Sequence, residues 1–163
     1  MSEIIKVGMA DLNICVSPNG ITTLGLGSCV GIALRDPVTL IGGLAHIMLP
    51  SSTAIRNGQQ NLAKFADTGI EELVRRMVAK GASRPRLVAK IAGGATMFKF
   101  EGNTNIAMQV GMRNVEASKK KLAEMNIPIL AQDTGADYGR TVIFYPETGD
   151  YHIRSVGKKE III

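Results

Sequence analysis

The feature that most constrains the fold is a glycine-rich segment that leads directly into a strand of alternating bulky and small residues. Over residues 30–34, valine, isoleucine and leucine alternate with glycine and alanine. Alternation with a period of two is typical of a β-strand whose two faces differ. We therefore predict a strand with bulky side chains on one face and an almost bare opposite face.

A turn signal, Asp36-Pro37, follows this strand, and residues 40–49 form the next strand candidate. If a short loop begins at Asp36, antiparallel pairing places Cys29 opposite His46. Directly opposed residues have Cβ atoms about 4.5–5.5 Å apart, which suits a hydrogen bond between a thiol and an imidazole. The pattern thus predicts that these two side chains meet on the bare face, and a one-residue slip would separate them.

The rest of the chain contains both helical and strand patterns. Apolar residues follow helical spacing over 61–80, where Gly81 suits a C-terminal cap, and again over 114–126. Further strand candidates occupy residues 4–9, 12–16, 86–92, 127–131, 141–145 and 151–156. This order predicts an α+β fold with a largely antiparallel sheet and helices on one side. We expect residues 1–163 to form a single domain, because a chain of this length can bury a sizeable core.

Composition narrows the function classes. Hydrophobic residues make up 45% of the chain and charged residues 20%, as in folded globular proteins. The net charge is +5, but aromatic residues are only 4% and Trp is absent, so the stacking groups of nucleic-acid-binding proteins are scarce. The sequence has no signal-peptide pattern, membrane span or disulfide framework. We expect a cytoplasmic protein with reduced thiols that neither binds nucleic acid nor inserts into a membrane.

Cys29 is the strongest candidate for a nucleophile. A free cysteine is more often a packing residue, and Cys15, within an ordinary strand pattern, is an example. Cys29 instead follows a flexible glycine segment, where backbone amides around Gly27 and Ser28 can converge on an oxyanion. A thiol nucleophile needs a neighbouring base, which His46 could provide.

A catalytic histidine usually has a third group that fixes its tautomer and orientation. Thr23 is one candidate, and Thr22 and Ser28 are rivals that the sequence barely separates from it. The two Cys and two His lack zinc-ligand spacing, and Val30 stands where a dinucleotide-binding loop needs its third glycine. We therefore predict a cysteine hydrolase that acts on amide side chains without a metal or cofactor.

Two segments closely resemble the CheD family of chemoreceptor glutamine deamidases. They are Thr-Leu-Gly-Leu-Gly-Ser-Cys-Val at residues 23–30 and Gly-Leu-Ala-His-Ile-Met-Leu-Pro at residues 43–50. The resemblance covers nearly the whole chain, and its other segments are residues 93–95, 111–114, 133–135 and 139–140. In that family the matching Cys is the nucleophile, the matching His is the base, and a Thr six residues before the Cys completes the triad. The resemblance thus implies these roles for Cys29, His46 and Thr23.

The resemblance also implies an α/β/β layered fold and a protein-glutamine deamidase that works through a cysteine thioester. The implied partners are methyl-accepting chemotaxis receptors and the CheC phosphatase, which the protein would modulate. Ala92 and Ala136 depart from the family pattern, which bears on loop shape only. A binding module for the phosphatase and amine transfer from the same acyl-enzyme remain alternatives. A papain-like protease is disfavoured, because its His lies about 130 residues or more beyond the Cys.

Overall fold

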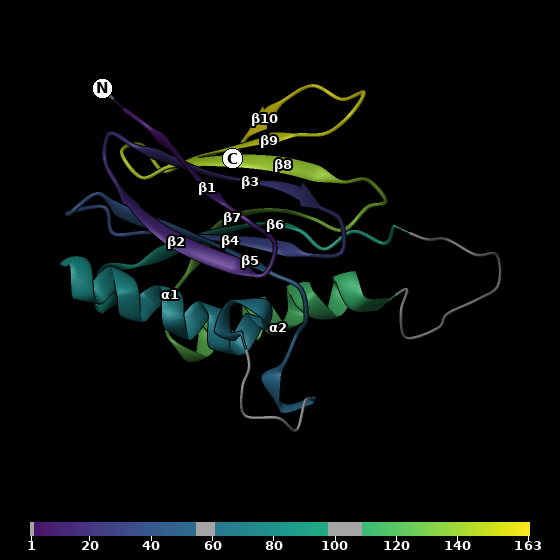
Figure 1. The fold of residues 1–163 in the computed structure, drawn as a ribbon, viewed down its shortest axis with the longest axis horizontal. Helices are drawn as coiled ribbons and strands as arrows, with labels where there is room; N and C mark the ends of the chain where they lie inside the picture. Colours follow the sequence, from purple (N-terminus) through teal and green to yellow (C-terminus); the bar gives the residue numbers. More distant parts are fainter. Residues whose placement is uncertain (1, 55–60, 98–108) are drawn as a thin grey trace.

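The computed structural model describes residues 2–54, 61–97 and 109–163. Within these ranges, two five-stranded sheets lie face to face, and two helices cover the free face of one sheet (Figure 1). The layers are thus helix, sheet and sheet. This arrangement confirms the predicted α+β fold with its α/β/β layers and its helices on one side.

We call the two sheets the outer sheet and the middle sheet. The outer sheet has the order β1 (Ile4–Val7), β3 (Gly20–Leu26), β8 (Arg140–Tyr145), β9 (Asp150–Arg154) and β10 (Ile161–Ile162). The middle sheet has the order β2 (Asp11–Val16), β5 (Ile41–Ile47), β4 (Val30–Arg35), β6 (Val88–Gly93) and β7 (Ile129–Thr134). Among the described strands, β1 with β3 and β6 with β7 pair in parallel, and the other pairings are antiparallel.

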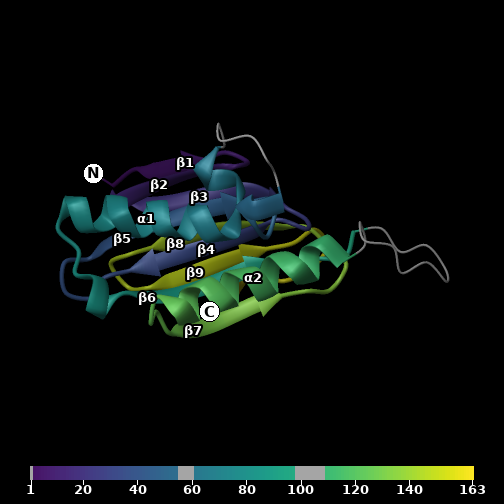
Figure 2. The same ribbon diagram turned by 90° about the horizontal axis from the view of Figure 1, so that it is seen from below.

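Helices α1 (Ala66–Lys80) and α2 (Val110–Glu124) run across the middle sheet, as Figure 2 shows from the helix side. Short 3₁₀ turns are formed by η1 (Ser52–Ala54), η2 (Leu62–Lys64) and η3 (Arg84–Arg86). Helix α1 ends as predicted at Gly81, whose amide donates to the carbonyls of Met77 and Val78 at a φ of 127°. Among the described residues, no helix is long and apolar enough to cross a membrane.

The alternation in β4 separates two cores. Val30, Ile32 and Leu34 pack against the helices, whereas Ala33 lies in the second core, between the sheets. The bare face of β4 is filled by the outer sheet: a Cβ on Gly31 would lie 2.7 Å from the Tyr151 hydroxyl. The small residues on this face therefore allow two sheets to approach each other closely.

The predicted hairpin of β4 and β5 forms, but its predicted register is wrong by two residues. His46 lies opposite Gly31, not opposite Cys29. The four-residue turn lies one position later than expected, at residues 37–40, because the Asp36 amide still pairs with the Ile41 carbonyl, and Leu40 within this turn adopts a φ of 58°. A shift of two residues preserves the face of a strand. Cys29 and His46 therefore remain on the same side of the middle sheet.

Other boundaries also differ from the sequence-based expectation, and α1 begins at Ala66, five residues after the predicted start. The sequence pattern did not predict β3 as a strand separate from the glycine-rich segment after it, because Thr22 and Thr23 interrupt the apolar alternation. Helix α2 begins at Val110, four residues before the predicted start. Its first turn includes Gly111, which packs against the carbonyl oxygens of Gly94 and Ala95.

Candidate active site

The three predicted triad residues come from both sheets. Thr23 lies on β3 of the outer sheet, His46 lies on β5 of the middle sheet, and Cys29 directly precedes β4. All three are buried, with exposed fractions of 1%, 0% and 7% respectively. Cys29 belongs to the core between the two sheets. The sandwich thus encloses these side chains at the middle of β3, just before β4 and near the end of β5.

A hydrogen bond of 2.7 Å joins the Thr23 hydroxyl to Nδ1 of His46. The same hydroxyl donates its one hydrogen to the Val7 carbonyl at 2.8 Å. It must therefore accept the bond from His46, which places the imidazole hydrogen on Nδ1. The other ring nitrogen, Nε2, then carries a lone pair, as a general base requires.

Nε2 of His46 is buried and has no hydrogen-bond partner among the described residues. A buried polar atom without a partner is uncommon and costs stability, so it is a marker for function. The rival Thr22 lies elsewhere, since its hydroxyl donates to the Val142 carbonyl at 2.6 Å. The structure therefore brings Thr23, and not Thr22, to the imidazole.

Burial favours the uncharged forms of both proposed reacting groups. It lowers the pKa of His46 to about 4, and it raises the pKa of the Cys29 thiol. A hydrogen bond from the backbone amide of Cys29 partly opposes the rise. Among the described contacts there is no hydrogen bond between the Cys29 sulfur and the His46 ring. The resting pair at neutral pH is therefore a thiol and a neutral imidazole.

Cys15 behaves as the predicted packing residue. Its side chain is 3% exposed in the core between the sheets, and burial raises its pKa to about 12. Its thiol donates a weak hydrogen bond to the Asn19 carbonyl, 3.7 Å from the sulfur. Such a thiol is inert at neutral pH.

The backbone before Cys29 is braced by the segment that follows β6. The Gly94 amide donates to the Cys29 carbonyl at 2.8 Å, and the Ala95 amide donates to the Gly27 carbonyl at 2.9 Å. Gly94 has a φ of 69°, and a Cβ there would collide with Val115 of α2. The glycine at this position is therefore required both by conformation and by space.

Asn114 is a site residue to which the sequence pattern assigned no role. It lies fully buried on α2, and its Nδ2 donates to the carbonyls of Ser28 and Met48, at 2.9 Å each. The available signal was a polar residue on a helix face that the neighbouring Val115 and Leu122 mark as inward. Backbone carbonyls thus use both Nδ2 hydrogens, while the buried Oδ1 of Asn114 has no hydrogen-bond partner among the described residues.

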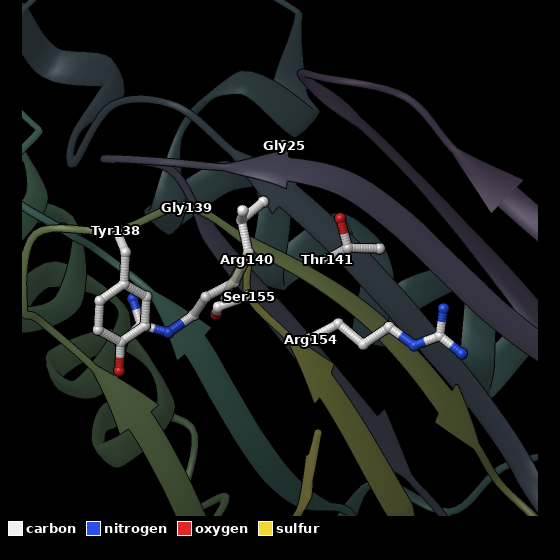
Figure 3. A pocket seen from close by; sticks show the side chains of 8 residues that line it. Gly25, Tyr138, Gly139, Arg140, Thr141, Arg154 and Ser155 are labelled. Carbon is white, nitrogen blue, oxygen red and sulfur yellow. The ribbon is translucent and has the colours of Figure 1, made fainter. Parts of the chain in front are cut away.

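Figure 3 shows a pocket of about 540 Å³ at the outer sheet. Its lining residues are Gly25, Tyr138, Gly139, Arg140, Thr141, Arg154, Ser155 and Val156. The Arg140 side chain reaches under the Tyr138 ring, 4.7 Å from its centroid, and pairs with Asp133 at 2.9 Å. Neither Cys29 nor His46 lines this pocket, so it is separate from the candidate triad.

A second pocket, of about 320 Å³, approaches the triad from the β1 side. It is lined by Lys6, Val7, Gly8, Met9, Thr22, Thr23 and Leu24. Across residues 2–54, 61–97 and 109–163, no cluster of three or more His, Cys, Asp or Glu side chains could hold a metal ion.

Comparison with known proteins identifies close relatives. A family model described as "CheD chemotactic sensory transduction" matches residues 48–155. A protein of Lachnoclostridium phytofermentans named probable chemoreceptor glutamine deamidase CheD is 61% identical over 98% of both chains. The chemoreceptor glutamine deamidase CheD of Halalkalibacterium halodurans is 52% identical over 99% of this chain and 100% of its own. Thr23, Cys29 and His46 precede the range matched by the family model, whereas these relatives align over almost the full length.

Among solved structures, the hypothetical protein YfiH of Bacillus licheniformis aligns with a TM-score of 0.41 and 15% identity. The alignment covers 72% of this chain and 51% of that chain. This likeness is too remote to carry an argument.

Proposed function

The chain belongs to the CheD family, and on that premise we propose that it hydrolyses side-chain amides of glutamine residues in chemotaxis receptors, leaving glutamate. The names of its relatives support the substrate class. The observation that carries the proposed chemistry is the bond between Thr23 and His46, which leaves Nε2 unprotonated and without a partner beside the segment that bears Cys29.

In the proposed first step, the Cys29 sulfur attacks the amide carbon of glutamine while the thiol proton passes to Nε2 of His46. Since the resting pair is neutral, this proton transfer accompanies the attack. Catalytic hydrogen bonds are commonly long in a free enzyme and tighten in the substrate complex. The carbonyl oxygen becomes an oxyanion, which the backbone amides of the loop around Cys29 stabilise.

In the next steps, His46 returns the proton to the nitrogen, the carbon–nitrogen bond breaks, and ammonia leaves a thioester on Cys29. A water molecule then gives one proton to His46 and attacks the thioester carbon. Collapse of this second intermediate breaks the carbon–sulfur bond, and His46 reprotonates the sulfur. The products are ammonia and a glutamate side chain, and Thr23 keeps the imidazole in one tautomer throughout.

Mass spectrometry of a receptor fragment tests the proposal. We expect wild type to produce the mass increase of an amide becoming an acid at specific glutamines. Cys29→Ala should lower the rate by more than about 10³-fold, whereas Cys15→Ala should retain it. Deamidation that survives Cys29→Ala would exclude Cys29 as the nucleophile. Conjugates formed with an added primary amine would instead indicate amine transfer from the same acyl-enzyme.

We further propose that the protein binds the CheC phosphatase and modulates its activity, which the family membership supports. Phosphatase activity measured with and without the protein tests this role. Because binding needs no thioester, Cys29→Ala should modulate the phosphatase as wild type does. Modulation without any receptor deamidation by wild type would favour a binding module over an enzyme.

A further inference from the structure

Asn114 joins the segments that carry the proposed nucleophile and base. Its Nδ2 donates to the carbonyls of Ser28 and Met48 at 2.9 Å each, which uses both amide hydrogens. Ser28 directly precedes Cys29, and Met48 follows His46 by two residues. One fully buried nitrogen on α2 therefore fixes the spacing of the two segments from the helix side of the middle sheet.

The bond to Ser28 also sets the direction of the next amide. In a planar trans peptide, the carbonyl and the following N–H point in opposite directions. Since the Ser28 carbonyl points to Asn114 on α2, the Cys29 N–H points away from the helix layer and toward the core between the sheets.

The Gly27 amide in the same loop is already engaged. It donates to the Gly25 carbonyl at 3.1 Å. Among the described residues, the Cys29 amide donates to no other residue. When a nucleophile attacks a carbonyl, its own amide is well placed to reach the developing oxyanion, as in the serine protease oxyanion hole.

We propose that Asn114 is a positioning residue that orients the Ser28–Cys29 peptide so that the Cys29 amide donates to the oxyanion of the tetrahedral intermediate. This inference rests on the proposed function, because it requires Cys29 to be the nucleophile. Asn114 itself touches neither substrate nor reacting atoms.

The test compares two reactions of the same thiol in a Cys15→Ala background. Deamidation forms an oxyanion, whereas alkylation of Cys29 by iodoacetamide is a displacement that forms none. Loss of one oxyanion donor commonly lowers turnover by about 10²–10³-fold. We expect Asn114→Ala to lower kcat by that factor with little change in KM, while alkylation slows by less than about tenfold.

Ser118→Ala is the matched control, since Ser118 lies fully buried one turn further along α2 and its hydroxyl bonds the Asn114 carbonyl at 2.7 Å. It should keep kcat and alkylation within about threefold of wild type. If Asn114→Ala does not fold, as judged by thermal unfolding, Asn114→Ser replaces it, because the hydroxyl keeps one donor in less space.

A folded variant with normal kcat would overturn the inference and leave the proposed function standing. An equal fall in kcat and in the rate of Cys29 alkylation would also overturn the inference, because it would show that the substitution disturbs the thiol in general. Absence of deamidation by wild type would overturn the proposed function and this inference together.

Discussion

At the scale of single residues, the Thr23 hydroxyl determines which form of the imidazole the site contains. It has one hydrogen, which it gives to the Val7 carbonyl, so it can only accept from Nδ1 of His46. Sequence reasoning barely separated Thr23 from Thr22 and Ser28, because the choice depends on the partner of each hydroxyl across two sheets. The family resemblance made the distinction that the residues alone did not.

Thr23→Val should therefore lower kcat, and it should also lower the free energy of unfolding by about 1–3 kcal/mol, because the Val7 carbonyl and Nδ1 of His46 lose a buried partner. The valine has nearly the same shape but cannot accept from Nδ1, so the imidazole loses its fixed tautomer. We expect kcat for receptor deamidation to fall by about 10²-fold, measured by mass spectrometry. Thr22→Val is the control, and it should keep kcat because its hydroxyl bonds Val142. Equal effects of the two variants would contradict the assignment of Thr23.

The buried His46 should make folding stability depend on pH. Burial lowers its pKa from 6.5 to about 4, so below pH 6.5 the unfolded chain binds a proton that the folded protein excludes. The contribution of the neutral His46 to the free energy of unfolding is complete above pH 6.5 and is lost as the pH falls toward 4. The free energy of unfolding, measured in urea, should be about 3 kcal/mol lower at pH 4 than at pH 7.

His46→Gln should remove this dependence between pH 6.5 and 4. His152→Gln should retain it, because His152 lies near the surface beside Glu160. Asp36, whose pKa is lowered chiefly by its hydrogen bond to Arg86, loses its contribution only at more acidic pH. An unchanged slope in His46→Gln would show that another group causes the effect.

At the scale of elements, the two faces of a strand are easier to predict than the register in which it pairs with its neighbour. The alternation in β4 correctly separated a bulky face from an almost bare one, since period-two alternation is a local property of the chain, but it did not predict that a second sheet covers the bare face. The hairpin register depends on the turn, where Leu40 adopts a positive φ and the Asp36 carboxylate accepts from the amides of Val38 and Thr39. No alternation pattern encodes that geometry, so the predicted pairing of Cys29 with His46 was displaced by two residues.

Asp36→Asn should destabilise the fold through this turn. The Asp36 carboxylate is fully buried and also accepts from the Ser83 amide and the Arg86 guanidinium. We expect a loss of about 3 kcal/mol in the free energy of unfolding, measured in urea. Arg86→Gln should cost less, because the Arg86 side chain is 40% exposed and water screens its charge. The reverse order would indicate that the ion pair, and not the capped turn, dominates.

At the scale of the whole molecule, the candidate site exists only where the two sheets meet. Thr23 comes from the outer sheet, His46 comes from the middle sheet, and Cys29 directly precedes β4, the central strand of the middle sheet. The order of elements predicted helices on one side of a largely antiparallel sheet, because helices must cover a sheet face, whereas the α/β/β layers were implied by the family resemblance. It could not predict which residues of separate sheets touch, since the contact between Thr23 and His46 arises from packing across 23 positions of sequence.

The spacing of the two sheets should therefore control activity, and Gly31→Ala tests this. Gly31 lies opposite His46, and a Cβ there would lie 2.7 Å from the Tyr151 hydroxyl, which donates to the Gly31 carbonyl at 2.9 Å. The added methyl group must push β9 away from β4. We expect a stability loss of about 1–3 kcal/mol, and a fall in kcat of up to about 10²-fold because the bond between Thr23 and His46 spans the same gap.

Gly43→Ala is the matched control for overpacking. Gly43 lies on β5, the same strand as His46. A Cβ on Gly43, however, would lie 2.5 Å from the Leu73 side chain of α1, on the helix side of the middle sheet. It should lose comparable stability in urea unfolding while kcat stays within about threefold of wild type, because the sheet-to-sheet distance is unaffected. If the two variants lose kcat equally at equal stability, general loosening of the core explains the effect, and the spacing of the sheets does not govern the site.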